Sequence, residues 1–86
     1  MKIVYTASFD RERKRLPRDI QELLKQQIER FLYDFKDARL HIKKLRGTEV
    51  AVYSLRVTRN YRVLFYWEDK ETPVWFEIDH RKDVYR

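Results

Sequence analysis

The fold of this chain is decided by residues 18–35, which read RDIQELLKQQIERFLYDF. Apolar residues recur there every three or four positions, the spacing that places side chains on one face of an α-helix. The opposite face mixes acids and bases, which is typical of a helix packed on a sheet and not of a helix lying on a membrane. The segment therefore predicts a long amphipathic helix whose apolar stripe consists of Ile20, Leu23, Leu24, Ile28, Phe31, Leu32 and Phe35.

A shorter helix is predicted upstream, over residues 9–16. Its Phe9 and Leu16 lie seven positions apart and so share a face, and Thr6 and Ser8 are both candidates for its N-cap. Pro17 can end this helix and open the next one, which predicts a helical hairpin pivoting on the proline. Residues 2–6 alternate apolar and polar side chains and form a plausible first strand.

After residue 39 the pattern changes to β-branched and aromatic residues, typical of strands, over 50–57, 61–67 and 74–78. Breaks at 58–60 and 68–73, the second containing a proline, separate these strands. Helices and consecutive strands are thus segregated along the chain. We expect an α+β domain over residues 1–86, with a mainly antiparallel sheet of three to four strands and both helices on one face.

Composition excludes several kinds of site. The 86 residues contain one glycine, no cysteine and two separated histidines, which argues against P-loop and dinucleotide-binding motifs and against a transition-metal site. No metal or cofactor is therefore expected. The net charge of +6 attracts polyanions, and any phosphate chemistry must depend on arginine and lysine. The first residues lack the apolar run of a signal peptide and no segment reaches transmembrane length, so we expect a cytoplasmic protein without membrane contact.

A basic segment over residues 41–47 joins the helices to the strands. In one interpretation it is a loop whose Ile42 and Leu45 enter the core while the cations face water. In the other, Lys43, Lys44 and Arg46 also form a strip that contacts a phosphate backbone without reading sequence. His41 is interpreted as a surface residue.

The hairpin between the second and third strands carries three arginines, and its register decides their arrangement. A two-residue loop, 59–60, would point Arg56 and Arg62 to opposite faces of the sheet, because side chains alternate along a strand. A three-residue loop, 58–60, would place them directly opposite each other on one face, as a preformed phosphate site. Arg59 lies at the turn. The sequence leaves both registers open.

The last seven residues, HRKDVYR, follow an apolar strand. They are suited either to a solvated charged tail or to a phosphate site, because histidine and tyrosine can transfer protons while arginine holds negative charge. On the tail alone the two interpretations have equal weight.

In combination these motifs resemble the RelE/ParE superfamily of bacterial toxin–antitoxin toxins. The resemblance covers nearly the whole chain and rests on Lys44-Leu45-Arg46-Gly47, Leu55-Arg56, Tyr61-Arg62-Val63-Leu64-Phe65-Tyr66, Ile78-Asp79-His80-Arg81 and Val84-Tyr85. Its most specific parts are Leu45-Arg46-Gly47, Tyr61-Arg62, and His80-Arg81 followed by Tyr85. It implies a cognate antitoxin that masks the active face, and the charge of the chain favours an acidic one. Trp67 or Trp75 could anchor this partner if exposed, although a tryptophan in a strand more often packs in the core. DNA would be contacted only through the complex with that antitoxin.

The resemblance also implies a function. RelE-like members cut messenger RNA on the ribosome without metal, using the ribose 2′-hydroxyl as nucleophile. By position, Arg62 and Arg81 would stabilise the scissile phosphate, with Arg56 as a further charge, and Tyr85 would orient substrate or exchange a proton, with His80 as second choice. Contacts to RNA or ribosome would come from Lys43, Lys44, Arg46, Arg59, Lys82 and Arg86.

One departure from the family leaves alternatives open. RelE-like ribonucleases often carry lysines on the second strand, but the alternating positions here are Val52, Ser54 and Arg56, so the general base is unassigned. The alternatives are a ParE-like poison of DNA gyrase and a binding domain on the same fold that has lost toxicity.

Overall fold

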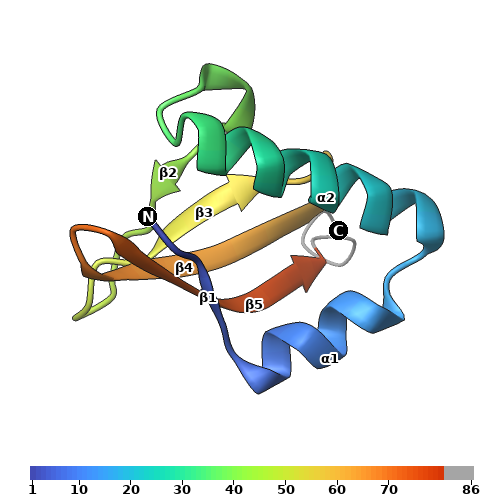
Figure 1. The fold of residues 1–86 in the computed structure, drawn as a ribbon. Coiled ribbons are helices and arrows are strands. Elements are labelled where there is room, and N and C mark those ends of the chain that lie inside the picture. The colour runs from blue at the N-terminus through green and yellow to red at the C-terminus, as the bar shows by residue number, and fades with distance from the viewer. Residues whose placement is uncertain (81–86) are drawn as a thin grey trace.

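The structure, a computed structural model, describes residues 1–80. The elements follow one another as β1 (Val4–Tyr5), α1 (Ala7–Arg15), α2 (Arg18–Tyr33), the 3₁₀ turn η1 (Ala38–Leu40), β2 (Lys43–Lys44), β3 (Tyr53–Arg56), β4 (Tyr61–Asp69) and β5 (Thr72–His80). Both helices cover one face of a single sheet, and no helix of residues 1–80 lies on the other face (Figure 1). No helix among the described residues is long and apolar enough to cross a membrane.

The sheet has five strands in the order β1-β5-β4-β3-β2. Only β1 runs parallel to its neighbour, β5, and the other three pairings are antiparallel. The predicted α+β class is confirmed, but the count of three to four strands was one too low. The additional strand is β2, two exposed lysines with no apolar alternation by which a strand could be recognised. A short, charged strand is a common way to protect the edge of a sheet.

The helices form where the apolar spacing predicted them, with small shifts at their ends. Of the two candidate N-caps, Thr6 caps α1, because its hydroxyl accepts a hydrogen bond from the Phe9 N–H at 3.2 Å. The predicted helix over 18–35 ends at Tyr33, two residues early. There the Asp34 carboxylate accepts a hydrogen bond from the Lys36 N–H at 3.0 Å, which turns the chain out of the helix.

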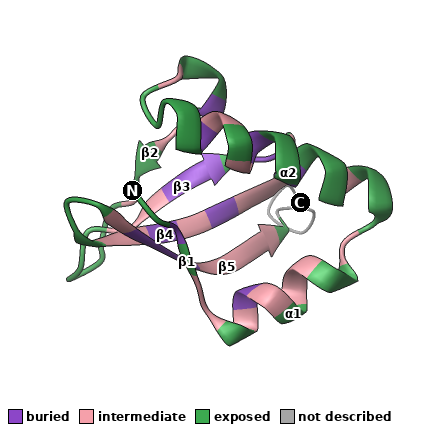
Figure 2. Cartoon of the chain, in the orientation of Figure 1, coloured by how far each residue is buried: buried purple, intermediate pink, exposed green. Residues whose placement is uncertain are grey.

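The core lies between the helices and the sheet (Figure 2). Phe9 of α1 and Phe31 of α2 both pack edge-on against Trp75 of β5, with ring centroids 6.0 and 5.3 Å away. Leu55 and Val63 contribute from β3 and β4, and all five side chains are buried. Trp75 is therefore not available as an anchor for a partner, whereas Trp67 is partly exposed.

All four predicted strands differ from their predicted lengths: β1 spans Val4–Tyr5 instead of 2–6, β4 ends at Asp69 instead of residue 67, and β3 and β5 also differ. β3 spans four residues instead of 50–57, and β5 starts at Thr72, so that Pro73 lies inside a strand and not in the break. The proline is tolerated because pairing of β5 with β1 begins only at Val74, and a register shift between Trp67 and Asp69 interrupts the β4–β5 ladder nearby.

Candidate phosphate-binding site

The register of the β3–β4 hairpin is that of the three-residue loop. Arg56 and Arg62 are direct partners across the two strands, and the Val57 N–H donates to the Tyr61 carbonyl at 2.9 Å. Inside the loop the Thr58 hydroxyl accepts hydrogen bonds from the N–H groups of Asn60 and Tyr61, both at 3.2 Å. The two arginines therefore share a face of the sheet, as one of the two alternatives predicted.

That face is the one without helices. Leu55 and Val63, which precede and follow the arginines on their strands, are fully buried under the helices. Because side chains alternate along a strand, Arg56 and Arg62 point the other way. The hairpin thus presents two guanidinium groups side by side on the open face.

Asp79 of β5 completes a row across this face. It pairs with Arg62 in the β4–β5 ladder, and its Oδ2 accepts a hydrogen bond from the Arg62 Nε at 2.9 Å. The carboxylate offsets part of the repulsion between the neighbouring arginines. Residues 1–80 offer no other hydrogen bond to the Arg62 guanidinium.

Asp79 was not among the site residues predicted from the sequence. The residue belongs to the Ile78–Arg81 motif, but its partnership with Arg62 follows from pairing between β4 and β5, which lie far apart along the chain at this point. A fixed register would have been needed to find it.

The cations converge on a hollow of about 250 Å³ beside β2. Five cationic side chains contribute to its lining, namely Lys43, Lys44, Arg46, Arg56 and Arg62. Lys43 is the cross-strand partner of Ser54, so β3, which has no lysine at its alternating positions, has one beside it from the next strand. The basic segment is therefore both an edge strand and part of a cationic surface, which we call the basic hollow.

His80 does not join the basic hollow. It is the partner of Tyr61 at the end of the β4–β5 ladder, and the two rings stack at 4.2 Å with an interplanar angle of 4°. Tyr61 packs against the core on the helix-covered side, so His80 lies on that side too. The physical reason is again alternation, since Asp79 takes the open face and its neighbour must take the other.

The other predicted site residues are distributed as follows. Arg59 is exposed at the hairpin turn and does not line the hollow. His41, interpreted from sequence as a surface residue, is exposed but lies on the rim of the hollow, in a left-handed conformation with φ of 47°. Arg81, Lys82, Tyr85 and Arg86 lie outside the described residues, and their assigned roles stay predictions.

No cluster of three or more potential metal-ligating His, Asp or Glu side chains occurs among residues 1–80. The hollow is lined by guanidinium and ammonium groups together with Ser54 and His41. Such a set can hold a phosphate by charge and by bidentate hydrogen bonds.

Comparison with known proteins gives matches at the level of structure. No family model matches the sequence, and no curated protein does. Among solved structures, the RelB–RelE antitoxin–toxin complex from Methanococcus jannaschii contains a chain with 26% identity and a TM-score of 0.75, over 95% of this chain and 94% of that one. A YoeB/ParE toxin from Agrobacterium tumefaciens matches with 17% identity and a TM-score of 0.76, over 93% of this chain and 98% of that one.

The archaeal RelE–RelB complex from Pyrococcus horikoshii also matches, with 19% identity and a TM-score of 0.74 over 95% of this chain and 96% of that one. These likenesses extend over nearly the full length of each chain. They therefore concern the whole domain and not a shared substructure.

Proposed function

We propose that this chain, which has the RelE/ParE fold that its sequence resembles, is the toxin of a type II toxin–antitoxin system and acts as a ribosome-dependent, metal-independent messenger endoribonuclease. The observation that carries the proposal is the arginine pair Arg56 and Arg62, which stands on the open face of that fold beside the basic hollow. This arrangement fits the charge of a scissile phosphate.

In the proposed reaction the ribose 2′-oxygen attacks the phosphorus, a new P–O2′ bond forms and the P–O5′ bond breaks. One proton leaves the 2′-hydroxyl and one reaches the departing 5′-oxygen. Negative charge grows on the non-bridging oxygens in the transition state. In this proposal Arg56 and Arg62 stabilise that charge and Lys43 adds a third cation from β2, which is supported by their common lining of the basic hollow.

Asp79 acts as a positioning residue in this proposal. By holding the Arg62 Nε at 2.9 Å, it orients the guanidinium and leaves the two terminal nitrogens available for a phosphate. Proton transfer is assigned to Tyr85 by the resemblance. Of the two histidines, His41 lines the basic hollow and His80 faces the other side of the sheet, so the proposal gives the assisting role to His41 instead of His80.

The partners follow from the same proposal. The matched structures from Methanococcus jannaschii and Pyrococcus horikoshii are complexes of a RelE with a RelB. A net charge of +6 suits an acidic antitoxin that covers the basic hollow, and DNA would be reached only through that complex. Messenger RNA and the ribosome are the proposed targets of the free toxin in the cytoplasm.

The test is primer extension on a defined messenger in a reconstituted bacterial translation reaction, with ribosomes omitted in a parallel sample. We expect breaks within codons only when ribosomes are present, and a loss of about 10²-fold or more in cleavage rate for Arg62→Ala. Lys25→Ala, which removes an exposed cation from α2, is the matched control and should cleave normally. An intact messenger would refute the ribonuclease proposal, and DNA breaks dependent on gyrase would then favour the ParE-like alternative.

A further inference from the structure

A second cationic hollow opens at the edge of the sheet, between α2, η1 and the end of β3. Its volume is about 210 Å³, and the charged or titratable side chains that line it are Arg30, Arg39, His41 and Arg56. Among residues 1–80, no aspartate or glutamate lines it. We call this feature the arginine notch. Because Arg56 and His41 also line the basic hollow, the two cationic surfaces adjoin at the sheet edge.

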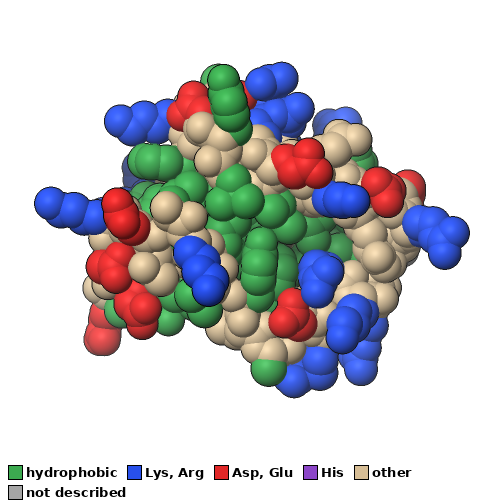
Figure 3. Space-filling view, viewed as in Figure 1, with side chains coloured by type: hydrophobic (Ala, Val, Ile, Leu, Met, Phe, Trp, Pro, Cys, Tyr) green, Lys and Arg blue, Asp and Glu red, His purple; other side chains and the backbone are tan. Residues whose placement is uncertain are grey.

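The notch differs in charge from the face of the molecule that Figure 3 shows. On that face, acidic and basic side chains occur together around an apolar centre (Figure 3). A surface with both signs of charge attracts a polyanion weakly, whereas a concave site lined by one sign of charge concentrates the field. The lining of the notch therefore favours an anionic ligand.

A buried amide holds the arginines of the notch in place. Gln27 of α2 is 6% exposed, and its Oε1 accepts a hydrogen bond from the Arg30 guanidinium. The Gln27 Nε2 donates to two main-chain carbonyls, that of Arg56 at 2.6 Å and that of Arg39 at 3.3 Å. One buried side chain thus joins α2, η1 and β3, and it restrains the Arg30 guanidinium before any ligand binds.

The register of the hairpin explains half of this arrangement. The Val57 N–H bonds to the Tyr61 carbonyl, so in the alternating antiparallel pattern the Arg56 carbonyl points away from β4. The Gln27 Nε2 supplies the partner that this carbonyl needs. The Gln27 Oε1 is not required for that task, and it holds a cation instead.

Arg30 carries a charge that the described residues leave without a counter-ion. Its partner Gln27 is neutral, and Arg30 makes no ion pair with any of residues 1–80. Arg39, by contrast, holds the Asp37 carboxylate through contacts of 2.7 and 3.0 Å. The Arg30 side chain is also partly buried, where a charge-assisted hydrogen bond is stronger than in full solvent.

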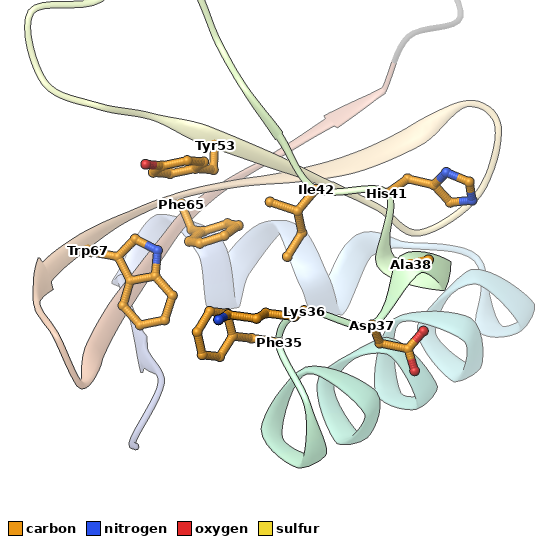
Figure 4. A pocket seen from close by; sticks show the side chains of 9 residues that line it. All are labelled: Phe35, Lys36, Asp37, Ala38, His41, Ile42, Tyr53, Phe65 and Trp67. Carbon is orange, nitrogen blue, oxygen red and sulfur yellow. The ribbon is translucent and has the colours of Figure 1, made fainter.

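His41 and Arg56 form the boundary between the notch and the basic hollow. Figure 4 shows the His41 imidazole pointing away from the aromatic side chains around Phe35 and Trp67. The left-handed backbone of His41 lies where the chain turns from η1 into β2. A strand that crosses this boundary leaves the cations of the basic hollow and reaches Arg30 next.

We infer that the arginine notch is a second phosphate site, which holds a phosphodiester of the same single-stranded RNA beyond the segment in the basic hollow. The Arg30 guanidinium donates to that phosphate, and Arg56 stands between the two sites. The choice of RNA rests on the proposed function, whereas the choice of an anion rests on the lining of the notch. Among residues 1–80, no phenylalanine, tyrosine or tryptophan lines it, so it takes a phosphate and not a stacked base. Binding there is independent of sequence.

The test titrates the full chain with two labelled single-stranded RNAs that carry 2′-O-methyl groups, followed by fluorescence anisotropy. The short RNA has about five nucleotides, enough for the basic hollow alone, and the long RNA has about ten. At about 0.1 M salt, Arg30→Ala should weaken binding of the long RNA about fivefold and make its salt slope shallower by about 0.7. The short RNA should bind as before. Lys25→Ala, which removes an exposed cation from the same helix outside the notch, should change neither RNA.

A second variant avoids replacing a partly buried arginine. Asp37→Asn retains a side-chain oxygen for the Arg39 N–H, which the carboxylate now accepts at 2.9 Å, but it removes the negative charge beside Arg39. It should tighten binding of the long RNA about fivefold at about 0.1 M salt and leave the short RNA unchanged. A gain of affinity is not a consequence of a damaged fold.

Several outcomes would overturn the inference. These are unchanged binding of the long RNA by both Arg30→Ala and Asp37→Asn, an equal loss of the two RNAs in Arg30→Ala, and an equal loss in Lys25→Ala. A polyglutamate peptide that binds through Arg30 more tightly than the long RNA would assign the notch to an acidic protein segment instead.

Messenger cleavage is measured separately, so that the two proposals can fail independently. A chain that binds the long RNA through Arg30 but never cuts messenger keeps the second phosphate site and refutes the ribonuclease. A chain that cuts messenger but binds the long RNA without Arg30 does the reverse.

Discussion

The salt dependence of RNA binding tests the basic hollow directly. Five cations line it, and among residues 1–80 only Arg62 of these is ion-paired, with Asp79, so we count four charges toward phosphate binding. Each phosphate neutralised on a single strand contributes about −0.7 to the slope of log affinity against log salt, so the unaltered chain should show about −2.8. Arg56→Ala removes one of these four charges and should make the slope shallower, at about −2.1.

These slopes correspond to measurable affinities. Between about 50 and 200 mM salt, binding should weaken roughly 50-fold for the unaltered chain and roughly 18-fold for Arg56→Ala. Fluorescence anisotropy of a labelled single-stranded RNA with 2′-O-methyl groups measures this without cleavage. Asp79→Ala should act in the opposite direction and steepen the slope to about −3.5, because it frees the charge of Arg62 as the fifth cation.

The control is Lys25→Ala, which removes the same charge from an exposed position on α2. An equal reduction of the slope by Lys25→Ala and Arg56→Ala would show that RNA binds diffusely and would refute the hollow as the binding site. A slope for Asp79→Ala that is shallower than that of the unaltered chain would also refute it.

Three further predictions concern the scaffold. Phe31→Ala should destabilise the fold by about 3–5 kcal/mol and lower the Tm by more than about 12 °C, because Phe31 is fully buried among four aromatic rings. The exposed control Tyr33→Ala should cost less than about 0.5 kcal/mol, and thermal unfolding followed by circular dichroism compares the two variants. Gln27→Ala should cost about 1–3 kcal/mol in urea unfolding, because the Gln27 Nε2 donates to the Arg56 carbonyl at 2.6 Å; an unchanged midpoint would contradict this. Hydrogen bonds from Arg39 lower the pKa of Asp37 from its ordinary value of 3.8 to about 2. The Asp37 carboxylate therefore stabilises the folded chain above about pH 4, and this contribution is lost as the pH falls toward 2. A carboxyl NMR titration of Asp37 with a midpoint near 3.8 would refute this prediction.

The helical half was predictable because its signals are local. The period of apolar residues in 18–35 and the proline at position 17 act over a few residues, and α2 forms over Arg18–Tyr33 accordingly. Its early end was not predicted, because the apolar Phe35 continues the stripe while the Asp34 side chain turns the backbone. The same local logic missed β2, whose two lysines form a strand only through pairing with Tyr53 and Ser54.

The candidate site shows a different division. The amino-acid sequence by itself determined the chemical inventory: a charge of +6, one glycine, no cysteine, and arginines concentrated near one hairpin. It also carried the motifs that resemble the RelE/ParE superfamily. Because residue types set which interactions are available, composition alone was enough to exclude P-loop and dinucleotide sites.

Pairing between strands in the folded chain determines which of these groups meet. It placed Arg56 beside Arg62, brought Asp79 to the Arg62 Nε, added Lys43 next to Ser54 and turned His80 to the other face. Each of these outcomes depends on the register between strands. A shift of one residue in that register moves every side chain to the opposite face, and hydrogen bonds between segments far apart along the chain select the register.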